Sequence, residues 1–226
     1  MSQNYTTLWK EKRNKIRNKY QFNAEWEDII DYIFKERIYN YFLNPIKTII
    51  NKKEWKWEWF SVLALECLLI ETLAAFRDWK CYNYQNNSWY YYKDSRKLFI
   101  KFLKNKKIWI FEGNFWTKDW TNPIWIAEKF YSEVRCWILH EAQTKWNWTI
   151  NTSKWAKRKG YFLEKKNGKI QIYRTTLYCK LESYIGDYCK ELKEVSKTWE
   201  ELRKKLWRKL DHMFEINEKA WFDWWV

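Results

Sequence analysis

One arginine and one histidine stand at a spacing that suits chemistry on a phosphate: Arg135 and His140. His140 is one of only two histidines in the chain, and an imidazole titrates near neutral pH, so it can take or give a proton. Arginine stays charged and presents a fork of donors that can stabilise negative charge on phosphorus. Such a pair would suit RNA cleavage without a metal: we expect His140 to act as general base or acid and Arg135 to stabilise the phosphorane, with a 2′,3′-cyclic phosphate as the product.

Both residues fall in a segment, 122–145, whose pattern predicts a helix. Asn122 is suited to cap its N-terminus, and Pro123 suits the first helical position, where no N–H is needed. Five residues of helix place Arg135 and His140 about 140° apart around the axis and about one and a half turns along it. The two side chains do not stack, yet both are long enough to converge on one phosphate. Apolar residues recur at three- and four-residue spacing, which predicts a buried face: Ile126, Phe130, Val134 and Ile138.

The run Arg135-Cys136-Trp137-Ile138-Leu139-His140 resembles the R-x4-6-H motif of the HEPN superfamily. The wider runs 130–136 and 138–142 are similar to those of uncharacterised bacterial members. The resemblance implies an all-α domain, and many such domains are metal-independent endoribonucleases in toxin, defence and RNA-processing systems. It also implies a homodimer, in which two copies of the motif helix bring both Arg–His pairs into one cleft.

Two other interpretations of Arg135 and His140 stay open. One is a non-catalytic HEPN-like module that binds RNA or a protein partner, such as an antitoxin, through a basic surface. The other is a helical protein whose only function is assembly. Mutual burial of the two side chains would favour these alternatives, whereas exposure in a basic cleft would favour the enzyme.

The most apolar segment, 60–76, predicts the central helix of a bundle. We expect it to be too short to span a bilayer, and hence no membrane association. Its only charges are Glu66 and Glu71, and a charge in a buried helix needs a partner. Glu71 is therefore the predicted supporting residue of the site, where it orients Arg135 or His140; the alternative is that it reaches solvent or a structural lysine.

The charge balance of the chain points to a polyanionic partner. The 226 residues include 43 basic and 28 acidic side chains, a formal net charge of +15. Such an excess attracts RNA, although lysines spread along the chain also make an ordinary solvated surface. Five cysteines at irregular spacing predict reduced thiols, and together with an N-terminus that lacks a signal peptide they predict a cytoplasmic protein. No glycine-rich phosphate loop or metal-binding spacing occurs, so no cofactor is expected.

The whole pattern predicts an all-α, HEPN-like helical bundle with one small β-hairpin appendage. We expect a single domain over 23–220, a basic N-terminal extension over 1–22 that is a fraying tail or a solvated helix, and an aromatic tail over 221–226. Two alternating runs around Asn167-Gly168 predict the hairpin, at about 160–173. The predicted helices, besides the motif helix and the apolar helix, cover 24–43 with a break or kink at Asn44-Pro45, 95–103, 175–192 and 196–217; His212, in the last, is expected to have a structural or surface role.

Tryptophan and glycine occur in unusual proportions, 20 against 4. Average usage of about 7% would give roughly 16 glycines in a chain of this length. A left-handed residue commonly follows a helix C-cap, and glycine accepts that conformation whereas a bulky side chain resists it. We hypothesise that many tryptophans are glycines in the native protein, through a UGA codon reassigned to glycine; the alternative is a set of indoles that stack on nucleobases. Four tryptophans stand where glycine would be expected: Trp79, Trp89, Trp120 and Trp146.

Overall fold

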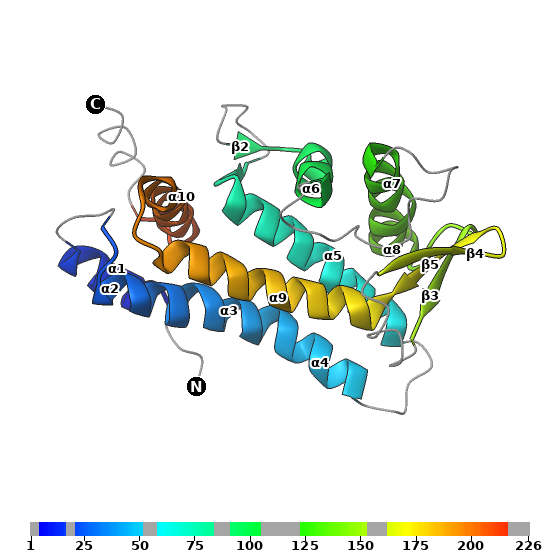
Figure 1. Cartoon of the computed structure of the whole chain (residues 1–226), viewed down its shortest axis with the longest axis horizontal. Coiled ribbons are helices and arrows are strands. Elements are labelled where there is room, and N and C mark those ends of the chain that lie inside the picture. Colours follow the sequence, from blue (N-terminus) through cyan, green and yellow to red (C-terminus); the bar gives the residue numbers. More distant parts are fainter. Residues whose placement is uncertain are drawn as a thin grey trace. The chain divides into compact units, whose positions relative to one another are not determined.

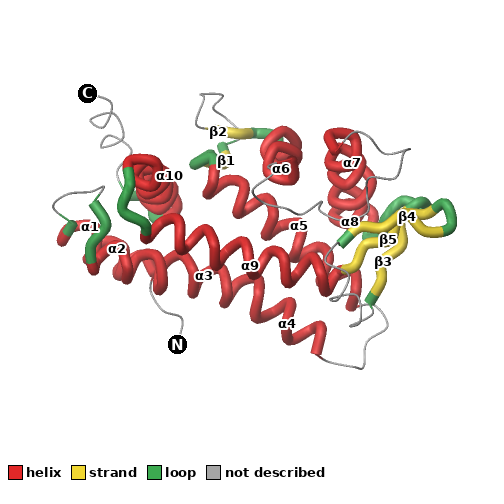
Figure 2. The backbone as a smooth tube through the Cα atoms, viewed as in Figure 1, coloured by secondary structure: helices red, strands yellow, loops and turns green. Residues whose placement is uncertain are grey.

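The computed structural model describes residues 5–16, 21–51, 58–83, 91–104, 123–152 and 162–216. These residues are mostly helical, with two small sheets (Figures 1 and 2). The predicted helical class with a small β element is therefore confirmed. The expectations for Asn122, Trp89, Trp120 and the tail 221–226 lie outside the described residues.

The chain groups into two compact units. We call residues 1–39, 75–93 and 185–226 the terminal unit, and residues 40–74 and 94–184 the motif unit. Helices α5 (Glu58–Arg77) and α9 (Arg174–Lys193) each contribute residues to both units. The single domain expected over 23–220 stays a prediction.

The terminal unit has an aromatic core. Trp207 packs edge-on against Trp9, with 4.9 Å between ring centroids, and lies tilted against Trp26 at 5.8 Å. Phe34 lies between Phe76 and Tyr188, at 5.0 and 5.2 Å. Besides its share of α5 and α9, the unit contains α1 (Tyr5–Lys15), α2 (Ala24–Asp28), the π-helical η1 (Ile29–Lys35), α3 (Glu36–Ile38), the parallel strands β1 (Cys81–Tyr82) and β2 (Tyr91–Tyr92), and α10 (Lys197–Met213).

The N-terminal segment is packed rather than solvated. Trp9 of α1 is fully buried, and its indole N–H donates to Asp211 Oδ1 of α10 at 3.0 Å. Arg13 donates to both oxygens of the same carboxylate, at 2.8 and 3.1 Å. Of the two alternatives for this segment, residues 5–15 form the helix, but its inner face is packed rather than solvated, because one buried aspartate binds two of its side chains.

The motif unit combines helices with a three-stranded sheet. Its strand order is β3-β5-β4, with β4 antiparallel and β3 parallel to β5. Asn167 and Gly168 turn between β4 and β5 with φ of +51° and +75°, as a two-residue hairpin requires. The hairpin is therefore confirmed over 163–173. Besides its share of α5 and α9, the unit contains α4 (Asn44–Asn51), α6 (Ser95–Lys104), α7 (Pro123–Lys129), the π-helical η4 (Phe130–Arg135), α8 (Cys136–Glu141), β3 (Trp148–Asn151), β4 (Leu163–Lys166) and β5 (Lys169–Tyr173).

The helical run 24–51 continues through Asn44-Pro45, where the sequence predicted a break or kink. A π-helical segment, η2 (Tyr39–Leu43), ends directly before α4. Proline removes one N–H from the helical ladder, and a π-turn pairs residues five apart rather than four. The wider turn therefore lets the backbone hydrogen bonds of the helix continue on both sides of Pro45, which has no N–H to donate.

Helix α5 is longer than the apolar segment suggested. Residues Trp59–Arg77 have the length and mean hydropathy (1.8) of a membrane span, so the expectation that the segment is too short is wrong. However, 56% of the segment is buried within the protein, as in the core helix of a soluble protein. Glu66 is fully buried in it, and this burial raises the pKa of Glu66 well above its usual range, an effect that the Arg174 charge and the Tyr178 backbone N–H oppose.

The described tryptophans differ in backbone conformation and in burial. Trp79 follows α5 in a left-handed conformation, with φ of +48°. Its N–H donates to Phe76 O at 3.3 Å, and the Lys80 N–H donates to Ala75 O at 3.0 Å, the two bonds of a Schellman motif. This position is one that glycine normally fills, as the sequence predicted. Four other tryptophans are buried side chains of the two cores: Trp9, Trp26, Trp148 and Trp207.

Trp146 does not follow the prediction. Ala142 takes the left-handed position after the motif helix, with φ of +54°, because that helix ends at Glu141, four residues before the predicted end. Trp146 has no positive φ and is 80% exposed. Of the two described tryptophans at positions where glycine was expected, Trp79 has the positive φ that favours glycine and Trp146 does not.

The backbone at Trp79 predicts an unusual order of stability for two variants. At an ordinary helix position glycine is about 1 kcal/mol less stable than alanine. At a left-handed position the order reverses, so we expect Trp79→Gly to be more stable than Trp79→Ala by about 1 kcal/mol. Urea denaturation of both variants measures the difference. Lys190, exposed within α9, is the control position, where Lys190→Gly should be less stable than Lys190→Ala. The same order of glycine and alanine at both positions would contradict the prediction.

Candidate functional site

The motif arginine is held by the carboxylate that the sequence singled out. Arg135 ends η4, and its Nη2 donates to Glu71 Oε2 of α5 at 2.7 Å. The two side chains are only 15% and 18% exposed. Of the alternatives for Glu71, the structure shows the contact with Arg135, which fixes the direction of the guanidinium.

Tyr131 is a third member of the site that the sequence analysis missed. Its ring lies under the guanidinium of Arg135, with 5.4 Å from Cζ to the ring centroid, a cation–π distance. Its hydroxyl lies 3.3 Å from Ser95 Oγ and donates to Asp94 Oδ1 at 3.4 Å. The available signal was spacing, because Tyr131 is four residues before Arg135 and such residues are neighbours on a helix.

The environment of Arg135 keeps it charged. Burial alone lowers the pKa of Arg135, but the hydrogen bond and the charge of Glu71 outweigh burial and raise the pKa above its usual value. The Nε atom is enclosed and has no hydrogen-bond partner among the described residues. A buried donor without a partner is rare in folded proteins, and a catalytic role is one of the explanations for it.

His140 is placed differently from Arg135. It lies in the last turn of α8 and is exposed, one residue before the end of the helix. In the part of the chain that the structure describes, no hydrogen bond or ion pair joins it to another residue, Arg135 included. The two motif residues are therefore neither mutually buried nor in direct contact: one is anchored inside the unit, and the other faces solvent.

Exposed leucines flank the anchored pair. Leu68 is 39% exposed and lies one turn from Glu71 on α5. Leu139 is 36% exposed and lies one turn from Arg135 on α8. Each member of the anchored pair thus has one exposed leucine a single turn away on its own helical segment.

The described residues contain no cluster of three or more His, Cys, Asp or Glu side chains that could hold a metal ion. The second histidine of the chain, His212, lies in the terminal unit, half-buried in the last turn of α10. There its ring packs against Tyr91 with 6.1 Å between centroids, in agreement with the predicted structural or surface role.

The candidate site consists of residues of α5, η4 and α8 within the motif unit. The sequence matches no protein-family model, and neither curated proteins nor solved structures give a significant match.

Proposed function

We propose that the chain is a HEPN-like, metal-independent endoribonuclease of the cytoplasm. The observation that supports this proposal is that Glu71 of α5 anchors Arg135. Arg135 lies on the same helical run, η4 and α8, that carries the exposed His140. An enzyme site of this kind needs a cation of fixed direction and a proton-transfer group that a substrate can reach. The HEPN resemblance of the motif supplies the remaining argument.

In the proposed reaction, His140 takes the proton from a ribose 2′-hydroxyl. The 2′-oxygen attacks phosphorus, the bond to the 5′-oxygen breaks, and an imidazolium returns a proton to that leaving oxygen. Arg135 stabilises the extra negative charge on the phosphorane. The products are a 2′,3′-cyclic phosphate and a 5′-hydroxyl.

The proposal includes a homodimer formed through the motif helix. Two imidazoles, one from each copy, would then share the roles of base and acid. The exposed leucines beside the pair, Leu68 and Leu139, are the apolar surface that a second copy would cover.

The product chemistry tests the proposed function. We expect the purified protein to cleave single-stranded RNA in the presence of EDTA, because neither motif residue needs a metal to act. The measurement is gel analysis of end-labelled RNA, with removal of the cyclic phosphate to identify the new 3′ end. Cleavage that EDTA abolishes, or 3′-hydroxyl products, would contradict the proposal.

A second candidate function is a non-catalytic HEPN-like module that binds RNA or a protein partner. It is favoured by one observation: the guanidinium of Arg135 is already paired with the carboxylate of Glu71, so its positive charge is balanced before any phosphate binds. In that case the protein would bind RNA without cleaving it, or would bind a protein partner such as an antitoxin. The EDTA experiment, run beside an RNA-binding assay, distinguishes the two functions.

A further inference from the structure

Helix α6 has one buried face and one cationic face. Its apolar side chains are enclosed: Leu98, Phe99, Ile100, Phe102 and Leu103. Lys97 and Lys101 are exposed on the other face, and Lys104 is half-buried near the end of the helix; Arg96 is exposed in its first turn. The four cations therefore gather on one short element of the motif unit.

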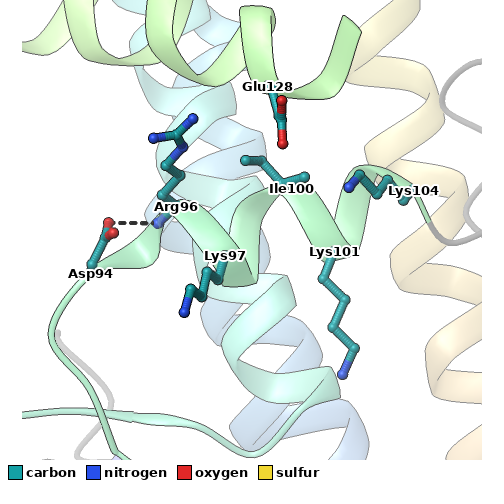
Figure 3. Close-up of a pocket in the computed structure, with 7 residues that line it drawn as sticks. All are labelled: Asp94, Arg96, Lys97, Ile100, Lys101, Lys104 and Glu128. Carbon is teal, nitrogen blue, oxygen red and sulfur yellow. Dashed lines mark hydrogen bonds between the residues drawn. The ribbon is translucent and has the colours of Figure 1, made fainter. Parts of the chain in front are cut away.

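The cationic face borders a groove beside α7 (Figure 3). The groove has a volume of about 540 Å³, and Ile100 is part of its lining. Glu128 projects from α7 toward α6, Arg96 reaches toward α7, and Lys97 and Lys101 point away from α7 (Figure 3). We call this region the α6 groove; its lining consists of Asp94, Arg96, Lys97, Ile100, Lys101, Lys104 and Glu128.

The α6 groove has an excess of positive charge over its carboxylates. Of its two acids, Asp94 accepts the backbone N–H of Arg96 at 2.8 Å, which caps the N-terminus of α6. It also accepts the hydroxyl of Tyr131 at 3.4 Å. Glu128 is thus the one lining carboxylate that is not used to cap the helix, whereas the lining contains four cations.

We propose that the α6 groove binds the sugar-phosphate backbone of single-stranded RNA. Lys97, Lys101 and Lys104 follow one another along about 10 Å of helix axis, a length that about three stacked nucleotides cover at the roughly 3.4 Å rise of one strand of a duplex. Cations in a groove that tracks the backbone are the usual means of binding a single strand without reading its sequence. This assignment rests on the proposed function in one respect, the choice of RNA as the polyanion.

A chain of contacts connects the α6 groove to the motif arginine. Asp94 in the groove binds the hydroxyl of Tyr131, and the ring of Tyr131 lies under the guanidinium of Arg135. All three residues belong to the motif unit. RNA bound along α6 would therefore lie close to Arg135, one of the two residues that are proposed to cleave it.

The test is charge reversal in a cleavage-deficient background. We compare the double variant Lys97→Glu and Lys101→Glu with a matched control, Lys165→Glu and Lys166→Glu, all with His140→Ala. The control lysines are exposed on the hairpin of the same unit, so both double variants change the net charge equally. The probe is a fluorescently labelled single-stranded RNA, measured by anisotropy at several salt concentrations, and circular dichroism and thermal melting check that each variant is folded.

We expect the α6 variant to bind RNA at least 10-fold more weakly, with a shallower dependence on salt because two phosphate contacts are lost. The control should bind within about 2-fold of its parent if α6 rather than total charge determines affinity. Equal weakening in both variants, no weakening in the α6 variant, or no RNA binding by the parent would overturn the assignment. RNA binding that depends on α6 without cleavage by the unmodified protein would instead contradict the nuclease alone.

Discussion

His140→Ala is expected to lower the rate of RNA cleavage by about 10²- to 10⁴-fold, the usual contribution of a positioned proton-transfer group. The imidazole is exposed in the last turn of α8. Its loss should therefore change the free energy of unfolding by no more than about 0.5 kcal/mol. Single-turnover cleavage of a labelled RNA measures the effect, and thermal melting confirms that the protein remains folded.

The other histidine provides the matched control. His212 lies in the terminal unit beside Tyr91, away from the motif helix in sequence. His212→Ala should cleave RNA as the unmodified protein does. Equal rates in both histidine variants and in the unmodified protein would show that neither imidazole takes part, and the assignment of His140 would be wrong.

Arg135→Ala should be as impaired in cleavage as the His140 variant, but its interpretation is less direct. Arg135 is the partner of the mostly buried Glu71. Truncation of one partner leaves the other carboxylate without its hydrogen bond and lowers stability. His140 is thus the better probe of the chemistry, because its removal leaves the packing of the motif unit intact.

Asp211→Ala is expected to lower the free energy of unfolding by about 3–5 kcal/mol, because a buried charge that loses its partner is strongly destabilising. The carboxylate is 5% exposed and accepts hydrogen bonds from Trp9 and from two nitrogens of Arg13. Without it, α1 loses its polar attachment to α10. Urea denaturation measures the change, and limited proteolysis should show earlier cleavage near the N-terminus.

Asp187 is the matched control for Asp211. Its ion pair with Lys190 joins two exposed side chains three residues apart on α9. Such a pair contributes little, so Asp187→Ala should change the free energy of unfolding by less than about 0.5 kcal/mol. A similar effect at both aspartates would mean that Asp211 does not hold α1 in place.

The sequence was sufficient to predict those structural features that depend only on residues close together in the chain. Apolar spacing located the helices at 60–76, 95–103, 122–145 and 175–192 to within a few residues, because helix formation follows a local period. Asn167-Gly168 located the hairpin, because that turn requires positive φ at both residues. The preference for glycine after a helix singled out Trp79 for the same local reason.

Other features required the tertiary structure, since they join residues far apart in the chain. Strand β3 is short and became recognisable only through its pairing with β5. The burial of α1 depends on Asp211, about 200 residues away, and no local pattern in a basic segment predicts such a partner.

The candidate site divides in the same way. The types and spacing of Arg135 and His140 determined, from the sequence alone, that an imidazole and a guanidinium share one helix. Only the folded chain decided that Glu71, 64 residues away, binds the guanidinium, that Tyr131 lies beneath it, and that His140 stays in solvent. Helix periodicity is set by bonds between neighbours, whereas the partner of a charge is set by which elements pack together.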